Sequence, residues 1–186
     1  MCQSTEPDPG VALVDVTEPV LEMLLSAALH DADADEVAPP LGTAGGWNTE
    51  RISWFREYHL AAAAGLDGPA QQKTWAITAG GEIAGSIRLR RLPQAGPAPG
   101  QAGQAQVGTL GTGTLETGIW LGRSFRGRGI GVAALRLVRA EAAAAGADLL
   151  QAETTAGNAA AQALLRSAGA ELTTNGPQVT ARFTLS

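Results

Sequence analysis

Three glycines at alternate positions, Gly127, Gly129 and Gly131, constrain this chain more than any other feature of its sequence. They lie between a segment of β propensity, 115–121, and an Ala- and Leu-rich helical segment, 130–145. The first amide N–H groups of a helix have no partner inside the helix, and the helix dipole adds partial positive charge there. Because glycine has no Cβ, the backbone can approach an anion closely. This succession predicts an anion-binding site.

Arginines surround the same glycines and favour a diphosphate as the ligand. They are Arg123, Arg126 and Arg128. A turn with solvated arginines is the alternative. A dinucleotide fingerprint also fits, because 129–134 reads G-x-G-x-x-A and Glu153 ends the next strand. That reading is disfavoured, since the arginine stretch separates the glycines from the preceding strand and the preceding elements do not alternate as βαβ.

The remaining periodicity predicts one α/β domain. Strands are expected at 11–16, 73–78, 82–92, 115–121, 149–154 and in a last hairpin ending with 179–185. Helices are expected at 18–29, 48–64, 130–145 and 158–168. The order indicates a mixed, mostly antiparallel sheet of about six to seven strands, flanked by four helices and containing one parallel crossover.

Three stretches are predicted to lie outside these elements. Residues 1–9 form a flexible N-terminus, and the domain occupies 10–186. Residues 93–113, rich in Gly and Pro, form a flexible loop or a lid over the substrate. Residues 31–40 form an exposed acidic loop, because Pro39 and Pro40 oppose a helix.

Composition narrows the function. The net charge of −5 opposes nucleic-acid binding and would attract a cationic small molecule. No apolar run approaches the roughly 20 residues that span a bilayer, so we expect no membrane partner. The only cysteine is Cys2, and no signal peptide is evident, so a cytoplasmic protein is expected.

The sequence of this glycine-rich segment resembles the signature of a known family. The run RGRGIG, 126–131, matches the [QR]-x-x-G-x-[GA] signature of the GCN5-related N-acetyltransferases (GNAT). The runs LETGIWLGRSFRGRGIGVAALRLV and TTAGNAAAQALLRSAGAEL extend the resemblance over the adjoining strands and helices, and the element order fits nearly the whole chain. The resemblance implies a GNAT fold that uses acetyl-CoA.

The resemblance also implies coenzyme-binding residues. The pyrophosphate would meet the backbone of Arg126, Gly127, Arg128, Gly129, Ile130, Gly131 and Val132. The backbone of Ile119, Trp120 and Leu121 would pair with the pantetheine arm as an added strand. Asn158 would hydrogen-bond the pantetheine, and it also suits a helix N-cap.

Two residues are candidates for proton transfer. Glu116 lies on the strand expected beside the thioester, where the family often has a glutamate as base or amine anchor; a solvated strand glutamate is the alternative. The family commonly uses a tyrosine as general acid where this chain has Leu165. Tyr58, the only tyrosine, is the substitute candidate, and a CoA thiolate can also leave unaided.

The acceptor site is expected on the first half of the chain, with Asp35, Glu36, Trp54 and His59 as candidate contacts. His59 is also consistent with a surface or half-buried residue, and Trp54 with a core or dimer contact. No carboxylate lies near His or Cys at ligand spacing, so no metal is expected.

Three functions stay open from the sequence. The first is acetylation of a small cationic amine, plausibly an aminoglycoside such as kasugamycin, on the basis of an overall resemblance to antibiotic-inactivating GNAT enzymes. The second is a protein N-terminal or lysine acetyltransferase of the ribosomal-protein type. The third is a CoA-binding module without catalysis. A homodimer is a further expectation.

Overall fold

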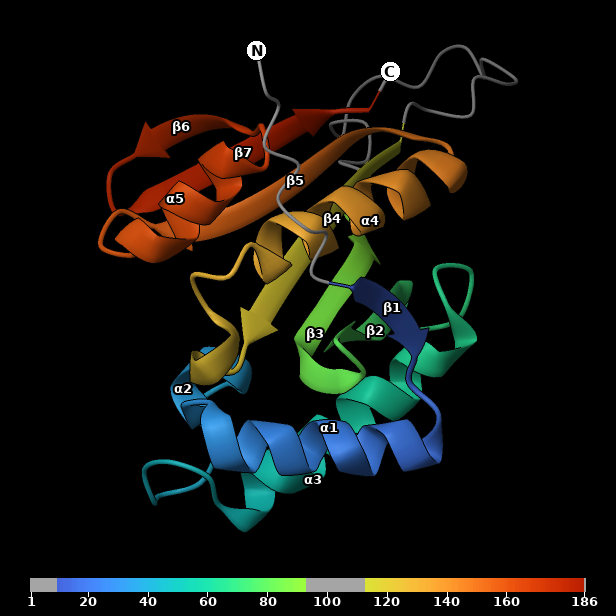
Figure 1. The fold of residues 1–186 in the computed structure, drawn as a ribbon, viewed down its shortest axis with the longest axis vertical. Helices are drawn as coiled ribbons and strands as arrows, with labels where there is room; N and C mark the ends of the chain where they lie inside the picture. Colours follow the sequence, from blue (N-terminus) through green and yellow to red (C-terminus); the bar gives the residue numbers. More distant parts are fainter. Residues whose placement is uncertain (1–9, 93–112, 186) are drawn as a thin grey trace, which may run out of the picture.

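The computed structural model describes residues 10–92 and 113–185 and contains one seven-stranded sheet in the order β1-β2-β3-β4-β5-β7-β6 (Figure 1). The strands are β1 Val11–Asp15, β2 Gln72–Ala79, β3 Glu82–Arg91, β4 Gly113–Leu121, β5 Ala147–Thr155, β6 Glu171–Asn175 and β7 Gln178–Thr184. All neighbouring strands are antiparallel except β4 and β5. The expected α/β class with one parallel crossover is confirmed.

Different helices bury the two faces of the sheet. The α-helices are α1 Glu18–Asp31, α2 Ala34–Val37, α3 Thr49–Ala61, α4 Ile130–Ala144 and α5 Ala159–Ser167. Ile87 of β3 is buried in the cluster that holds Leu135 of α4. Ala76 of β2 is buried in a second cluster with Leu24 of α1 and Phe55 of α3. Strand alternation therefore divides the molecule into an α4–α5 side and an α1–α3 side.

The structure differs from the sequence prediction in the acidic stretch and at the start of β4, besides small shifts at the ends of other elements. The acidic stretch is not only a loop, because 34–37 form the one-turn helix α2, which brings the described α-helices to five. The side chain of Asp33 accepts a hydrogen bond from the Asp35 N–H at 3.1 Å and caps this turn, which ends before Pro39. Gly113 begins β4 and does not belong to the loop. The flexible segments expected at 1–9 and 93–112 lie outside the described residues.

The parallel strands β4 and β5 separate halfway along their length. They pair from Gly113 to Thr117 of β4, whereas β4 continues to Leu121 and β5 to Thr155. Figure 1 shows the two strands leaving one another in this region. The edge of β4 over 118–121 that faces β5 therefore has no strand beside it, and α4 begins just after this open edge.

Candidate functional site

The segment 122–129 between β4 and α4, here called the glycine loop, leads to free backbone donors at the start of α4. Gly127 and Gly129 have φ of 70° and 76°, and a Cβ at either position would meet no atom within 4 Å. The Ala133 N–H donates to the Gly129 carbonyl, and the three preceding amides, 130–132, have no hydrogen-bond partner among the described residues. This left-handed turn needs glycine, and it leaves unpaired N–H groups at the positive end of a helix.

The backbone amide of Arg126, which was expected to meet the pyrophosphate, is already hydrogen-bonded within the chain. The N–H of Arg126 donates to the Arg123 carbonyl at 3.3 Å and closes the short 3₁₀ turn Arg123–Phe125. The free donors therefore begin after Arg126. Gly131 has a separate packing role, because a Cβ there would lie 2.8 Å from Leu164 of α5.

Asn158 caps α5, as the sequence allowed. Its Oδ1 accepts a hydrogen bond from the Ala161 N–H at 3.0 Å. No bond from its side-chain NH₂ group is found within the described parts of the chain, so that donor remains for a ligand. Leu165, at the position where the family often has tyrosine, is buried in the core.

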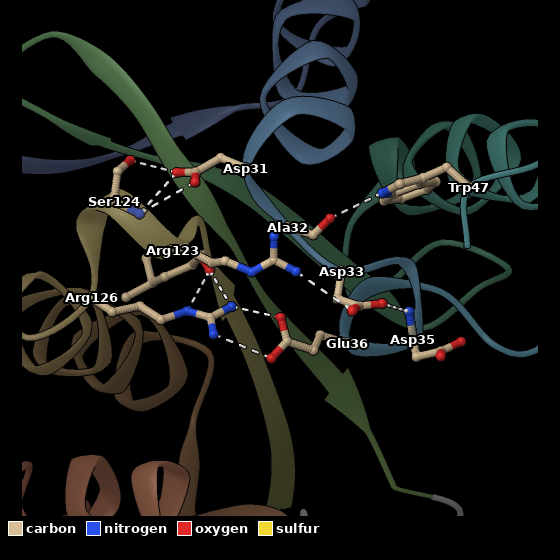
Figure 2. A network of polar contacts seen from close by, with 10 residues as sticks. Asp31, Ala32, Asp33, Asp35, Glu36, Trp47, Arg123, Ser124 and Arg126 are labelled. Atoms are coloured by element: carbon tan, nitrogen blue, oxygen red, sulfur yellow. Dashed lines mark hydrogen bonds and ion pairs between the residues drawn. The ribbon is translucent and has the colours of Figure 1, made fainter. Parts of the chain in front are cut away.

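The acidic stretch holds the glycine loop in place (Figure 2). Arg126 donates from Nη1 and Nη2 to the Glu36 carboxylate, at 3.2 and 2.6 Å, and from Nε to the Leu121 carbonyl at 3.0 Å. Asp31 accepts hydrogen bonds from both the N–H and the hydroxyl of Ser124. These bonds lower the pKa of Glu36 and of Asp31.

Asp35 and Glu36, which the sequence offered as contacts for the acceptor, are both paired with arginines. Asp35, offered as an anchor for a cation, pairs at 2.6 Å with Arg51, whose side chain is buried, and it does not line the cavity described below. Glu36 lines that cavity, but its carboxylate is engaged by Arg126. The sequence could not assign these partners, because the acids lie 16 and 90 residues from their arginines.

A cavity of about 210 Å³ lies between α3 and the strands β2, β3 and β4. Trp54, Tyr58 and His59 of α3 line it, together with Arg88 of β3. Gly118, Ile119 and Trp120 also line it, and they belong to the part of β4 that has left β5. The cavity thus adjoins the open edge of β4.

A charged cluster lies at the strand side of this cavity and contributes Arg88 to its lining. Arg88 donates to Glu116 from Nη2 at 2.5 Å and to the Tyr58 hydroxyl from Nη1 at 3.4 Å. Arg90 donates to the second oxygen of Glu116, also at 2.5 Å. Glu116 was expected to accept a proton, but both its oxygens are occupied, only 6% of its surface is exposed, and it does not line the cavity.

Arg88 is the site residue that the sequence did not single out. In the strand register it lies opposite Gly118, and a Cβ at Gly118 would come within 3.0 Å of the Arg88 Nε. The absence of that Cβ lets the guanidinium lie across β4. An arginine in the run IRLRR is typical of a solvated strand face, so only the pairing of distant strands reveals its role.

The aromatic side chains of α3 form the opposite wall. Trp54 and Tyr58 stack with ring centroids 4.8 Å apart, and Trp54 lines the cavity as a candidate contact should. His59 is buried, so the expectation of a surface or half-buried residue is wrong; its Nδ1 lies 2.9 Å from the Thr74 hydroxyl. Burial lowers the pKa of His59 to about 4, which leaves the ring neutral at pH 7.

Two features are absent from the described residues, a metal-binding cluster and a membrane-spanning helix. No group of three or more His, Cys, Asp or Glu side chains in this part of the chain is placed to hold a metal ion. None of the helices over 10–92 and 113–185 has the length and apolar character needed to cross a bilayer.

Comparison with solved structures gives the same fold in several acetyltransferases. An acetyltransferase from Salmonella typhimurium that modifies the N-terminal serine of ribosomal protein L7/L12 is 14% identical, with 96% of this chain and 97% of that chain covered and a TM-score of 0.68. The microcin C7 self-immunity acetyltransferase MccE, solved with acetyl-CoA and AMP, is 15% identical, with 95% and 93% covered and a TM-score of 0.65. The GNAT domain of S. lividans PAT is 19% identical, with 94% and 89% covered and a TM-score of 0.62.

Sequence comparison assigns the family. No curated protein matches the chain. A family model described as the acetyltransferase (GNAT) domain, however, matches residues 25–171, which contain both the glycine loop and the cavity. The free amides of α4, the open edge of β4 and this match agree, and the chain therefore belongs to the GNAT acetyltransferase family.

Proposed function

We propose that this protein is an acetyl-CoA-dependent N-acetyltransferase that binds the coenzyme between β4 and β5 and an amine in the adjoining cavity. The observation that carries the proposal is the set of unpaired amides at the start of α4, next to a left-handed turn with open space around it. Such a site suits a diphosphate because it combines directed donors with partial positive charge. The fold similarity to MccE, which was solved with acetyl-CoA, supports the choice of coenzyme.

Three parts of this chain would contact the coenzyme. The amides of 127–132 would hold the pyrophosphate, and Asn158 would donate to the pantetheine. The edge of β4 over Ile119, Trp120 and Leu121 would pair with the pantetheine arm as an added strand, which the separation of β4 from β5 permits. The Leu121 carbonyl already accepts hydrogen bonds from Arg126. When bound, acetyl-CoA supplies a thioester that transfers its acetyl group to a nitrogen.

The acceptor amine must be neutral to attack. An amine with a pKa near 10.4 needs roughly 4–5 kcal/mol to lose its proton at pH 7, and one near 8 needs only about 1–2 kcal/mol. Tyr58, which lines the cavity, is the group we propose for proton transfer at the reacting atoms. Glu116 would act one step away, by holding Arg88 against the Tyr58 hydroxyl.

The proposed acceptor is a primary amine, and it belongs to one of two classes, a small polycation or a protein N-terminus. A small polycation such as an aminoglycoside is supported by the net charge of −5, although Glu36, the one carboxylate of the cavity lining, is paired with Arg126. A protein N-terminal amine is supported by the fold similarity to the Salmonella enzyme that modifies L7/L12. A binding module without turnover is the third possibility.

Two measurements on the full chain test the proposal. Calorimetry should give a dissociation constant for acetyl-CoA, and a CoA-release assay against amines of both classes should identify an acceptor. Absence of acetyl-CoA binding would overturn the proposal as a whole. Tight binding without CoA release for any acceptor would support the non-catalytic module instead.

A further inference from the structure

Arg88, which lines the strand side of the cavity, belongs to a cluster with an excess positive charge that no described residue of the lining neutralises. Arg88 and Arg90 share the single carboxylate of Glu116, so the cluster has one guanidinium in excess. The other ionisable side chains of the lining do not offset it. Glu36 is paired with Arg126, and His59 is neutral because its pKa is lowered to about 4.

The guanidinium of Arg88 also has N–H groups that no described residue accepts. A guanidinium carries five N–H groups, and the described residues accept one hydrogen bond from Nη1 and one from Nη2. Its Nε is buried without a partner. A partly buried guanidinium with unused donors favours an incoming acceptor of matching geometry, and a carboxylate or a phosphate provides one through paired N–H···O bonds.

The position of Arg88 is fixed before any ligand arrives. Glu116 holds one end of the guanidinium, Tyr58 contacts another, and the bare backbone of Gly118 lies beneath it. A donor group held in this way loses little side-chain entropy when it binds a ligand. Gly118 is adjacent to Ile119, the start of the proposed pantetheine strand, so an anion on Arg88 would lie beside the coenzyme.

We infer that the acetyl acceptor carries an anionic group, a carboxylate or a phosphate, that binds Arg88 close to the amine that is acetylated. This inference rests on the proposed function and narrows its substrate class. An excess positive charge in the cavity disfavours a polycation, and it favours the neutral form of the attacking amine because like charge disfavours the ammonium. The charge that attracts the anion therefore also prepares the nucleophile.

Matched pairs of amines test the inference in the CoA-release assay. Serine is compared with its amide, and phosphoethanolamine with ethanolamine, while spermidine and kasugamycin form the polycation arm. The protein should prefer the anionic member of at least one pair by about 10-fold or more in kcat/KM, as expected for hydrogen bonds to a charged group. The pair that shows the preference distinguishes a carboxylate from a phosphate.

Variants then assign the preference to Arg88. Arg88→Gln should lower the ratio of kcat/KM between the anionic and the neutral member by about 10-fold or more, beyond any loss that both members share through the contact of Arg88 with Tyr58. The acetyl-CoA dissociation constant should not change. Arg136→Gln, an exposed arginine of α4, is the matched control and should preserve the ratio. If Arg88→Gln fails to fold, Gly118→Ala replaces it, because the new Cβ displaces the guanidinium without removing its charge.

The results that would overturn the anionic acceptor differ from the result that would overturn the acetyltransferase activity. Equal rates for both members of every pair, faster turnover of the polycations, or equal losses for both members in the Arg88 variant would overturn the inference while leaving an active acetyltransferase. Absence of acetyl-CoA binding would overturn the proposed function itself.

Discussion

The two sides of the site are built in different ways. The proposed coenzyme side uses mainly backbone groups, from the end of β4 through the glycine loop to the start of α4, with the side chain of Asn158 added from the start of α5. The acceptor side uses side chains from α2, α3, β2, β3 and β4, which are up to 84 residues apart, from Glu36 to Trp120. A backbone site keeps its chemistry when side chains change, whereas a side-chain site changes its ligand with each substitution.

The acidic stretch connects the two sides. Asp31, Asp33 and Glu36 contact Ser124, Arg123 and Arg126 of the glycine loop, respectively (Figure 2). Glu36 also borders the cavity. Four substitutions test this difference between the two sides, at one backbone position, one buried charge, one buried ring and one exposed contact.

The largest effect is expected for Gly129→Val. A β-branched residue resists φ of 76°, so the turn should rearrange and remove at least two amide donors from the coenzyme. Acetyl-CoA affinity measured by calorimetry should fall on the order of 10²-fold or more. Gly45→Ala, where a Cβ meets no atom within 4 Å and the backbone is not left-handed, should bind normally. Wild-type affinity in Gly129→Val would show that backbone amides do not dominate binding.

Glu116→Gln tests whether this buried carboxylate stabilises the acceptor side by neutralising Arg88 and Arg90. Removing this carboxylate leaves two guanidinium groups without a counter-ion, so urea denaturation should show a loss of about 2–3 kcal/mol in unfolding free energy, reduced from the fully buried case because the arginines are partly exposed. Glu57→Gln, an exposed residue of α3, should cost little. A kcat loss of about 10²-fold with unchanged stability would instead identify Glu116 as a base.

The buried ring of His59 should make stability depend on pH. Its pKa is about 4 in the folded protein and about 6.5 when unfolded, so the unfolded state binds more protons between these values. Stability should therefore fall as the pH drops below about 6.5, by about 2 kcal/mol at pH 5, and stop falling from this cause below pH 4. His59→Gln should flatten this part of the profile, and His30→Gln, at an exposed position, should not. An unchanged profile in His59→Gln would assign the effect to other groups.

The smallest effect is expected for Glu36→Gln. The ion pair with Arg126 is roughly half exposed, and such pairs contribute about 0–1 kcal/mol. The acetyl-CoA dissociation constant should change by less than about 5-fold, similar to the effect of Glu22→Gln, which breaks an exposed pair with Arg56 away from the loop. A change above about 10-fold would mean that this contact couples the two sides.

Much of the coenzyme side could be predicted from sequence. The glycine spacing located the start of α4 at Ile130, and the N-cap at Asn158 located the next helix, because both signals are local in the chain. The helical turn α2 was missed for the opposite reason. A single turn has no periodicity to detect, and its evidence is one side-chain bond from Asp33.

The acceptor side was predicted less well. Trp54 and Tyr58 were placed correctly on α3, but the partners of Glu36, Asp35 and Glu116 were not foreseen. Each of these partners lies on another element, so its distance along the chain carries no information about the contact. His59 was misplaced as well, since the burial of a helix face depends on what packs against it.

Local sequence patterns were enough to predict the glycine turn and the order of the elements other than α2, because hydrophobic period and backbone freedom act over a few residues. The fold as a whole places Arg88 over Gly118, Glu116 between two arginines and the acidic stretch against the loop. Those facts follow from strand register and helix packing, which bring together residues that no short stretch of sequence relates.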